Sequence, residues 1–239
     1  MRIALGPLLL LQGRQVRRTA IRLPEAAGPR HGRILLEGTN RELKLLFVGD
    51  STMAGVGVTR QEMALASQAA VEVSRLLSRP VRWQIIAKSG VKTNQILALV
   101  AQQDLLDADV LITALGVNDV LAQTKPRDFV RAYEKLIAAL LPAGRLRIAI
   151  ISGLPPLHIT PAFPQPLRWF LGIYARRLDR ILLRWIRGNH GVSYISLQWA
   201  TDRKRLATDR FHPGEGLYQD WAHQVAQQIA HEFSAASLA

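Results

Sequence analysis

The feature that most constrains the fold is a regular alternation of two kinds of segment, which begins near residue 43. Short and nearly continuous apolar runs have the length of buried β-strands, and they lie at residues 45–48, 83–87, 110–115, 148–151 and 192–197. Longer segments with the period of an amphipathic helix follow them, at residues 59–78, 93–103, 128–141, 167–186 and 214–233.

Strands that are apolar along their whole length are buried on both faces, and strands that alternate with helices run parallel to one another. We therefore predict an α/β fold, a three-layer α/β/α sandwich around a five-stranded parallel sheet. The chain has 239 residues, which is enough for one such domain. We assign residues 43–239 to this domain and residues 1–42, which are rich in arginine, to a basic N-terminal lead-in segment.

The chain carries 31 Lys and Arg against 18 Asp and Glu, and its net charge of +13 favours anionic partners. Residues 1–33 hold seven arginines and one acid, and residues 168–187 hold six arginines and one acid. Most of the surplus therefore belongs to two segments. No aromatic residue interleaves with the basic stretch of residues 14–33, which argues against a nucleic-acid partner.

Several kinds of site and segment find no support in the sequence. It contains no Cys, which excludes thiolate metal sites, and its six His residues form no metal-binding pattern. No complete nucleotide-binding motif is present, so we expect neither metal nor cofactor. The uncharged stretch of residues 3–13 is too short to span a bilayer, and no signal-peptide cleavage site follows it. We expect a protein of the cytoplasm or of the inner-membrane periphery, and a periplasmic location is less favoured.

Polar, turn-forming clusters follow four of the predicted strands. Each cluster alone is typical of a helix cap or a tight turn. In chain order they are Gly49-Asp50-Ser51-Thr52, Lys88-Ser89-Gly90-Val91, Gly116-Val117-Asn118-Asp119 and Asp209-Arg210-Phe211-His212. Because the carboxyl ends of parallel strands meet at one edge of a sheet, and ligands bind beyond that edge, the four clusters predict a single functional site.

These clusters are similar, in content and in order, to the conserved blocks of the SGNH, or GDSL, hydrolases. The matching positions are Ser51, Gly90, Asn118 and the pair Asp209 and His212, and the resemblance covers about residues 43–233. It implies a flavodoxin-like sandwich fold and hydrolysis of esters or thioesters by a serine nucleophile. Residues 1–42 lie outside the resemblance and inherit no function from it.

The chemistry of the same side chains agrees with that implication. A serine hydroxyl is a weak nucleophile until a base removes its proton, and His212 is the candidate base for Ser51. Asp209 is expected to accept a hydrogen bond from the second imidazole nitrogen and so to orient the ring. Pro213 suits the first position of the last helix and is expected to hold the loop that carries His212.

A tetrahedral intermediate also needs hydrogen-bond donors for its negatively charged oxygen. We predict that the backbone N–H groups of Ser51 and Gly90 and the side-chain amide of Asn118 form this oxyanion hole. Gly90 has no side chain and lets the backbone approach the substrate. We predict a structural role, in hydrogen bonding between neighbouring loops, for Asp50 and Asp119.

The proline-rich segment of residues 155–166 follows the fourth strand and should lie beside the site. We predict that it forms a lid or an acyl-pocket wall, with Phe163, Trp169 and Phe170 as substrate-binding residues. The arginines of residues 168–187, together with the N-terminal segment, are candidates for peripheral contact with an anionic membrane surface.

Three functions remain open at this point. The first is a hydrolase of short acyl esters, thioesters or lysophospholipids that works through an acyl-enzyme intermediate. The second is a carbohydrate O-acetyl esterase. The third is a catalytically silent adaptor that binds lipid or membranes, although such a protein has no chemical reason to keep Ser51, Asp209 and His212 together.

Overall fold

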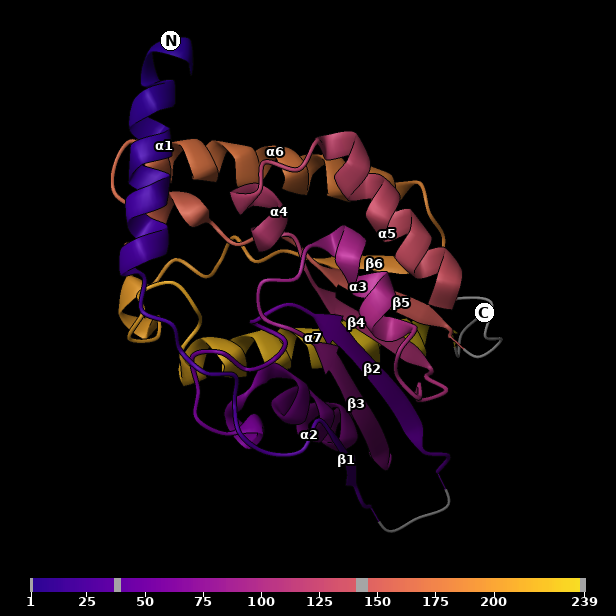
Figure 1. The fold of residues 1–239 in the computed structure, drawn as a ribbon. Helices are drawn as coiled ribbons and strands as arrows, with labels where there is room; N and C mark the ends of the chain where they lie inside the picture. The colour runs from indigo at the N-terminus through magenta and orange to yellow at the C-terminus, as the bar shows by residue number, and fades with distance from the viewer. Residues whose placement is uncertain (1, 37–39, 141–145, 237–239) are drawn as a thin grey trace.

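The computed structural model describes residues 2–36, 40–140 and 146–236. A sheet of six strands forms its middle layer, in the order β1-β3-β2-β4-β5-β6 (Figure 1). The strands are β1 (His31–Ile34), β2 (Leu43–Gly49), β3 (Val81–Ala87), β4 (Val110–Ala114), β5 (Ile148–Ser152) and β6 (Val192–Ile195). Strands β2 to β6 are parallel, as predicted, and β1 pairs with β3 in the antiparallel direction.

The prediction of five strands is wrong by this one edge strand. β1 has alternately exposed and half-buried residues, so it lacks the continuous apolar run by which buried strands are identified. It lies in the segment of residues 1–42, and its Gly32 sits against Trp83 of β3, where a Cβ atom would come within 2.7 Å of the indole ring. That segment therefore contributes a strand to the sheet.

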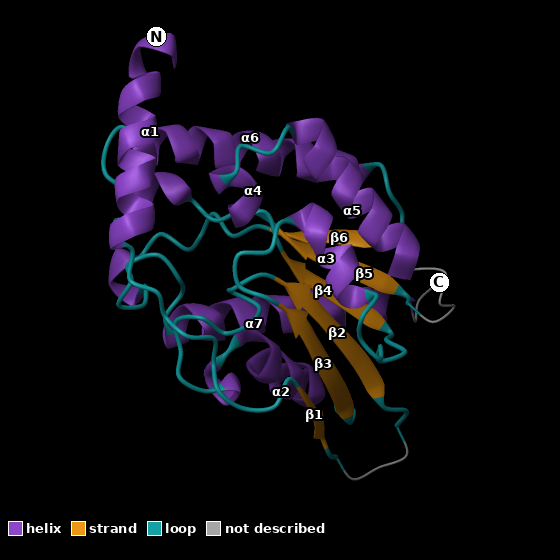
Figure 2. Ribbon diagram, in the orientation of Figure 1, coloured by secondary structure: helices purple, strands orange, loops and turns teal. Residues whose placement is uncertain are grey.

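Helices cover both faces of the sheet (Figure 2). One outer layer consists of α2 (Leu65–Leu77) and α7 (Glu215–Ala236), and the other of α3 (Thr93–Val100), α5 (Pro126–Leu140) and α6 (Leu167–Arg187). All five predicted helices are present. The short elements are α4 (Val117–Leu121) and the 3₁₀ turns η1 (Gln61–Met63), η3 (Leu157–Ile159) and η4 (Arg203–Arg205). The predicted C-terminal residue of the third helix, residue 141, lies outside the described residues.

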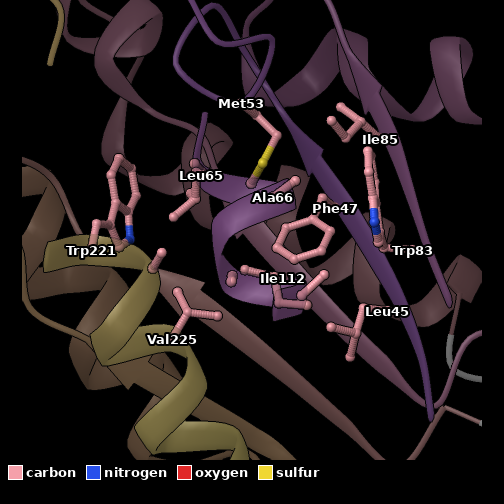
Figure 3. Close-up of a cluster of buried hydrophobic side chains, with 14 of the residues drawn as sticks. Leu45, Phe47, Met53, Leu65, Ala66, Trp83, Ile85, Ile112, Trp221 and Val225 are labelled. Carbon is pink, nitrogen blue, oxygen red and sulfur yellow. The ribbon is translucent and has the colours of Figure 1, made fainter. Parts of the chain in front are cut away.

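Two apolar clusters hold the three layers together, one on each face of the sheet. Because successive side chains of a strand point to opposite faces, Leu45 and Phe47 of β2 belong to the α2–α7 cluster, and Leu46 and Val48 belong to the other. Figure 3 shows the first cluster, in which Phe47 lies among side chains of the sheet and of both helices. This packing fixes the edge of the sheet from which the site is built.

The chain begins with a helix that the sequence analysis did not predict, α1 (Arg2–Thr19). It lies across the start of α6 (Figure 1), where Gln12 donates a hydrogen bond to the carbonyl of Gln165 at 2.7 Å and accepts one from the N–H of Leu167 at 3.1 Å. Leu9 and Val16 pack against the core cluster on that side. No helix within the described residues is long and apolar enough to cross a membrane.

Candidate active site

The four polar clusters all lie at the carboxyl edge of the parallel strands. Ser51 follows β2, Gly90 follows β3, and Asn118 lies in α4 just after β4. His212 reaches the same edge from the loop that precedes α7, and its Nε2 atom lies 2.8 Å from Oγ of Ser51. Two residues separated by 161 positions in the chain are thus in hydrogen-bond contact.

The turn that carries Ser51 depends on the glycine that ends β2. A Cβ atom at Gly49 would lie 2.4 Å from Cβ of Met53 and 2.7 Å from the carbonyl oxygen of Ala114, so no side chain fits there. The chain then turns sharply, and the N–H of Val56 donates to the carbonyl of Ser51 at 3.0 Å. This tight packing places Ser51 at the end of the strand with its side chain half-buried.

The imidazole of His212 is held from its other side by Asp209. Nδ1 of His212 and Oδ2 of Asp209 are 2.5 Å apart, and Oδ1 of Asp209 accepts hydrogen bonds from the backbone N–H groups of Phe211 and His212, both at 3.0 Å. Burial raises the pKa of the Asp209 carboxyl, but these three hydrogen bonds lower it by more than burial raises it. The net pKa of Asp209 therefore lies below the ordinary value. Asp209 is therefore ionised at neutral pH.

The loop with Asp209 and His212 is itself anchored at several points. The N–H of Ala207 donates to the carbonyl of His212 at 2.9 Å, and Arg205 forms an ion pair with Asp220 of α7 at 2.6 Å. Gly57 lies directly against the loop, because a Cβ atom there would come within 2.2 Å of the carbonyl oxygen of Pro213. The position of the imidazole is thus determined by contacts with both α7 and the turn after Ser51.

Asn118 lies beside this group and is bonded to the acid that precedes Ser51. Its Nδ2 atom donates to Oδ2 of Asp50 at 3.2 Å and to the carbonyl of Val91 at 3.1 Å. Asp50 is fully buried, and burial raises its pKa to about 6, although its hydrogen bond from the N–H of Thr52 opposes the rise. Asp50 thus connects the loop of Ser51 to Asn118.

Asp119 connects two further loops at the same edge. Its Oδ2 atom accepts hydrogen bonds from the backbone N–H of Thr93 at 2.9 Å and from the Thr93 hydroxyl at 2.7 Å. These contacts join α4 to the start of α3, and Asp119 is fully buried. This is the loop-bonding role that we expected for both acids.

Gly90 lies in the exposed turn after β3 with a φ angle of +80°, which glycine adopts without strain. It does not line the pocket described below, but Asn118 binds the carbonyl of the next residue, Val91.

The turn is held by Glu25, which accepts hydrogen bonds from the N–H of Ser89 at 2.8 Å and from its hydroxyl at 2.7 Å. Burial raises the pKa of Glu25, but these bonds and Arg30 lower it more, so the net pKa is below the ordinary value. Nothing in the sequence pointed to this contact.

A pocket opens beside Ser51, Asn118 and His212, and its walls are mainly apolar. Its free volume is about 90 Å³. Leu115 lies after β4, the proline-rich segment contributes one wall, and residues after β6 and from α7 close the other side. The apolar wall residues include Leu115, Pro155, Leu157, Ile159, Leu197 and Trp221. The proline-rich segment therefore lies at the site, as its position after the fourth strand predicted.

The three residues that we predicted to bind substrate do not line this pocket. Phe163 is buried and packs edge-on against Phe211, whose ring in turn packs against the imidazole of His212 at 4.8 Å between centroids. Phe170 packs against the core, and Trp169 is 43% exposed on α6. The first part of the segment, and not its aromatic end, faces the pocket.

Sequence reasoning missed the pocket residues Leu197, Trp199 and Trp221. The first two follow β6 and so reach the same edge as the other clusters, which was a usable signal. Trp221 lies one turn into α7, and nothing in the helical pattern distinguishes it from a core residue.

In the part of the chain that the structure describes, no group of three or more His, Asp or Glu side chains could hold a metal ion.

The fold and this geometry together define a class of protein: an α/β/α sandwich with a serine, a histidine and an aspartate in one hydrogen-bonded chain at the carboxyl edge of its sheet. Residues 47–231 match the GDSL-like lipase/acylhydrolase family. The protein belongs to this family, which makes it a carboxylic ester hydrolase.

Several solved structures share this fold. A lipase from a goat rumen metagenome, Lip_vut3, superimposes with a TM-score of 0.65 at 18% identity, covering 79% of this chain and 97% of that one. Est24, a carbohydrate acetylesterase from Sinorhizobium meliloti, gives a TM-score of 0.55 at 18% identity, with coverage of 79% and 99%. A lipase/acylhydrolase from Enterococcus faecalis gives 0.56 at 19% identity, with coverage of 80% and 96%. No curated protein matches the sequence.

Proposed function

We propose that this hydrolase cleaves short acyl esters or thioesters through an acyl-enzyme intermediate formed on Ser51. The observation that carries the proposal is the unbroken chain of contacts from Ser51 to His212 at 2.8 Å and from His212 to Asp209 at 2.5 Å. Both distances are within the reach that proton transfer requires. The family membership supplies the reaction type, and this geometry supports the assignment of roles to the three side chains.

In the first half of the reaction, Nε2 of His212 takes the proton of Ser51 while Oγ attacks the carbonyl carbon of the ester. The ionised Asp209 keeps the imidazole oriented and stabilises its positive charge. When the tetrahedral intermediate collapses, the bond to the leaving alcohol or thiol breaks and His212 returns the proton to it. Water, deprotonated by the same imidazole, then attacks the acyl-enzyme and regenerates Ser51.

The proposal assigns three donors to the oxyanion: the N–H groups of Ser51 and Gly90 and the side-chain amide of Asn118. Among the described residues, the N–H groups of Ser51 and Gly90 donate to no other protein group. Asn118 donates to Asp50 and Val91, and its amide must exchange one of these bonds for the oxyanion. If the bond to the Val91 carbonyl is the one exchanged, a neutral acceptor is replaced by a charged one, which forms the stronger hydrogen bond.

The size of the pocket supports a short acyl group. A water-sized sphere needs about 10–15 Å³ of such volume, so the pocket holds only several non-hydrogen atoms beyond the carbonyl. Its apolar walls suit an alkyl group and offer few partners to a polar one. A series of nitrophenyl esters with acyl chains of different length tests this. From the volume of the pocket, we expect kcat/KM to be highest for acyl chains of about two to four carbons. A maximum at long chains would favour lysophospholipid instead.

A carbohydrate O-acetyl ester is the second candidate, and one observation favours it. Trp199 lines both the acyl pocket and a neighbouring open groove between α2 and α7, and its buried Nε1 has no partner within the described residues. The groove is lined largely by polar side chains, including Gln68, Glu215, Gln219 and Gln224. An indole and planar polar groups are suited to sugar rings and hydroxyls. Comparison of acetylated oligosaccharides with simple acetates of equal leaving-group pKa separates this candidate from the first.

Labelling with a fluorophosphonate tests the nucleophile directly. We expect the wild-type protein to be labelled and Ser51→Ala to remain unlabelled while folding normally by circular dichroism. Ser67→Ala, at a half-buried serine of α2, is the matched control and should be labelled like the wild type. A folded wild-type protein that does not react would favour a catalytically silent lipid or membrane adaptor.

We also propose that the enzyme works in the cytoplasm or at the periphery of the inner membrane, in contact with anionic lipid. The support for this is the concentration of positive charge in two segments of the chain.

A further inference from the structure

The outer face of α6 carries a stripe of exposed cationic side chains. Leu171, Leu178 and Leu182 of this helix point into the core, so the opposite face points away from the sheet. That face holds Trp169, which is 43% exposed, and the exposed arginines Arg176, Arg177, Arg180, Arg184 and Arg187. Within the described residues, none of these arginines forms an ion pair with a carboxylate. The helix therefore presents five uncompensated positive charges on one surface.

Helix α1 presents exposed leucines next to this stripe. Leu8, Leu10 and Leu11 are 41%, 63% and 64% exposed. Leu10 and Leu11 point away from the side of α1 that carries Gln12, whose hydrogen bonds hold the helix against the start of α6, and Leu8 lies at the edge of that side. The exposed arginines Arg14, Arg17 and Arg18 follow within the next two turns. The exposed surface of α1 is thus apolar in its first half and cationic in its second half.

The two helices lie next to each other at one side of the molecule (Figure 1). In Figures 1 and 2, the N-terminal part of α1 extends past α6 in the direction away from the sheet. The helical residues before Gln12 span about 15 Å at a rise of 1.5 Å per residue, which exceeds the radius of α6. Leu10, Leu11 and Arg14 lie within two residues of Gln12, so they flank the start of α6 beside its cationic face.

We propose that the outer faces of α1 and α6 form a docking surface for an anionic phospholipid membrane. The arginines contact the headgroups, and the leucines of α1 together with Trp169 enter the boundary between headgroups and acyl chains. The argument for this occupant is charge complementarity combined with the adjacent apolar side chains, a combination that a soluble polyanion would not use.

The surface adjoins the active site through the wall of its pocket. Gly172 of α6 packs so closely on η3 that a Cβ atom there would lie 2.4 Å from Cβ of His158, and Leu157 and Ile159 of η3 line the pocket. The docking surface is thus one helix away from the acyl-binding wall. The proposal concerns binding alone and does not depend on the catalytic roles assigned above.

Sedimentation with vesicles of phosphatidylcholine, with and without phosphatidylglycerol, tests the proposal. We expect the full-length protein to bind only the vesicles that contain phosphatidylglycerol. Each arginine near an anionic surface contributes about fivefold to binding, so Arg177→Gln combined with Arg184→Gln should weaken it about 25-fold. Leu10→Gln combined with Leu11→Gln should weaken it about tenfold, because exposed leucines lose their contact with lipid.

Two control pairs keep the test specific. Arg60→Gln with Arg82→Gln removes the same charge elsewhere, and Val71→Gln with Leu76→Gln removes exposed apolar side chains from α2 on the opposite layer. Both should bind like the wild type, and circular dichroism verifies that every variant is folded. Equal binding to both kinds of vesicle, binding to neither, or equal losses in the control pairs would each overturn the proposal.

Discussion

At the scale of single residues, two buried carboxyls on either side of the nucleophile are tuned in opposite directions. Asp209 faces the imidazole of His212 and two backbone N–H groups, and its pKa lies below the ordinary value. Asp50 accepts hydrogen bonds from the Thr52 N–H and the Asn118 amide, but it is fully buried, and burial raises its pKa to about 6. The first is suited to stabilise a cation and the second to hold a neighbouring amide.

The raised pKa of Asp50 predicts a pH-dependent stability. Since the folded state binds this proton more tightly than the unfolded state, the contribution of Asp50 is complete below its ordinary pKa of 3.8 and is lost as the pH rises to about 6. Relative to Asp50→Asn, the free energy of unfolding of the wild type should fall by about 3 kcal/mol over this interval. Urea unfolding at several pH values measures it, with Asp128→Asn as an exposed control. A difference that does not change with pH would contradict the expectation.

Asn118 provides the second prediction at this scale. Asn118→Ala removes a side-chain donor from the proposed oxyanion hole, and loss of one such donor typically lowers kcat about 10²- to 10³-fold. KM should change little, because the donor acts mainly in the transition state. Steady-state kinetics with a nitrophenyl ester measures both constants. Asn94→Ala, at an exposed position in α3, is the control, and an unchanged kcat in Asn118→Ala would remove this residue from the oxyanion hole.

At the scale of elements, the site depends on how loops from different strands are pressed together. The turn after Ser51 and the loop with His212 touch at Gly57 and Pro213, although no regular element joins them. Gly57 has a φ angle of +109°, which residues with a side chain rarely adopt. The relative placement of the serine and the histidine therefore rests on a position where only glycine fits.

Gly57→Ala should consequently reduce both stability and activity. The added Cβ would meet the carbonyl oxygen of Pro213 at 2.2 Å, so the loop must move and carry His212 with it. We expect a loss of about 2 kcal/mol or more in the free energy of unfolding, and a lower kcat in the protein that remains folded. Thermal unfolding and active-site titration measure the two effects.

Gly13→Ala is the matched control for this substitution, since a Cβ atom at Gly13 meets nothing within 4 Å. It lies in α1 and should stabilise the helix slightly, by up to about 1 kcal/mol. If Gly57→Ala behaved like Gly13→Ala, the contact between the two loops would not be what positions His212.

At the scale of the whole molecule, the packing of helices on both faces of the sheet fixes the strand that ends at the active site. β2 lies in the middle of the sheet between β3 and β4, and it ends at the turn of Ser51. Its side chains alternate between the two core clusters, so both helical layers bear on the strand that positions the nucleophile. Figure 3 shows how Phe47 of this strand is enclosed.

Phe47→Ala should therefore be among the most destabilising single substitutions. Removal of a fully buried phenyl ring costs about 3–5 kcal/mol, through lost burial and the cavity left behind. For a protein of this size we expect the melting temperature to fall by about 10 °C. Leu35→Ala, at a position that is 74% exposed, should leave the melting temperature nearly unchanged. Similar melting temperatures for both variants would contradict this account of the core.

The sequence by itself determined the layered α/β architecture, the five parallel strands and the order of the chemical groups along them. The reason is that burial on both faces imposes continuous apolar runs, and that turn residues with a chemical role must follow those runs at one edge. It could not reveal β1, whose residues are only half-buried, or α1, whose helix depends on docking against α6.

Only the tertiary structure decided the contacts between residues far apart in the chain. Such contacts arise because the packed layers bring the ends of different loops together. Examples are the 2.8 Å contact of Ser51 with His212, the hydrogen bonds of Glu25 to the Ser89 turn, and the pocket wall that contains Pro155 and Leu157. The sequence pattern could not distinguish these wall residues from Phe163 and Trp169, because all are apolar residues of one segment and its adjoining helix turn. Packing against Phe211 turned Phe163 inward and left Trp169 on the surface of α6.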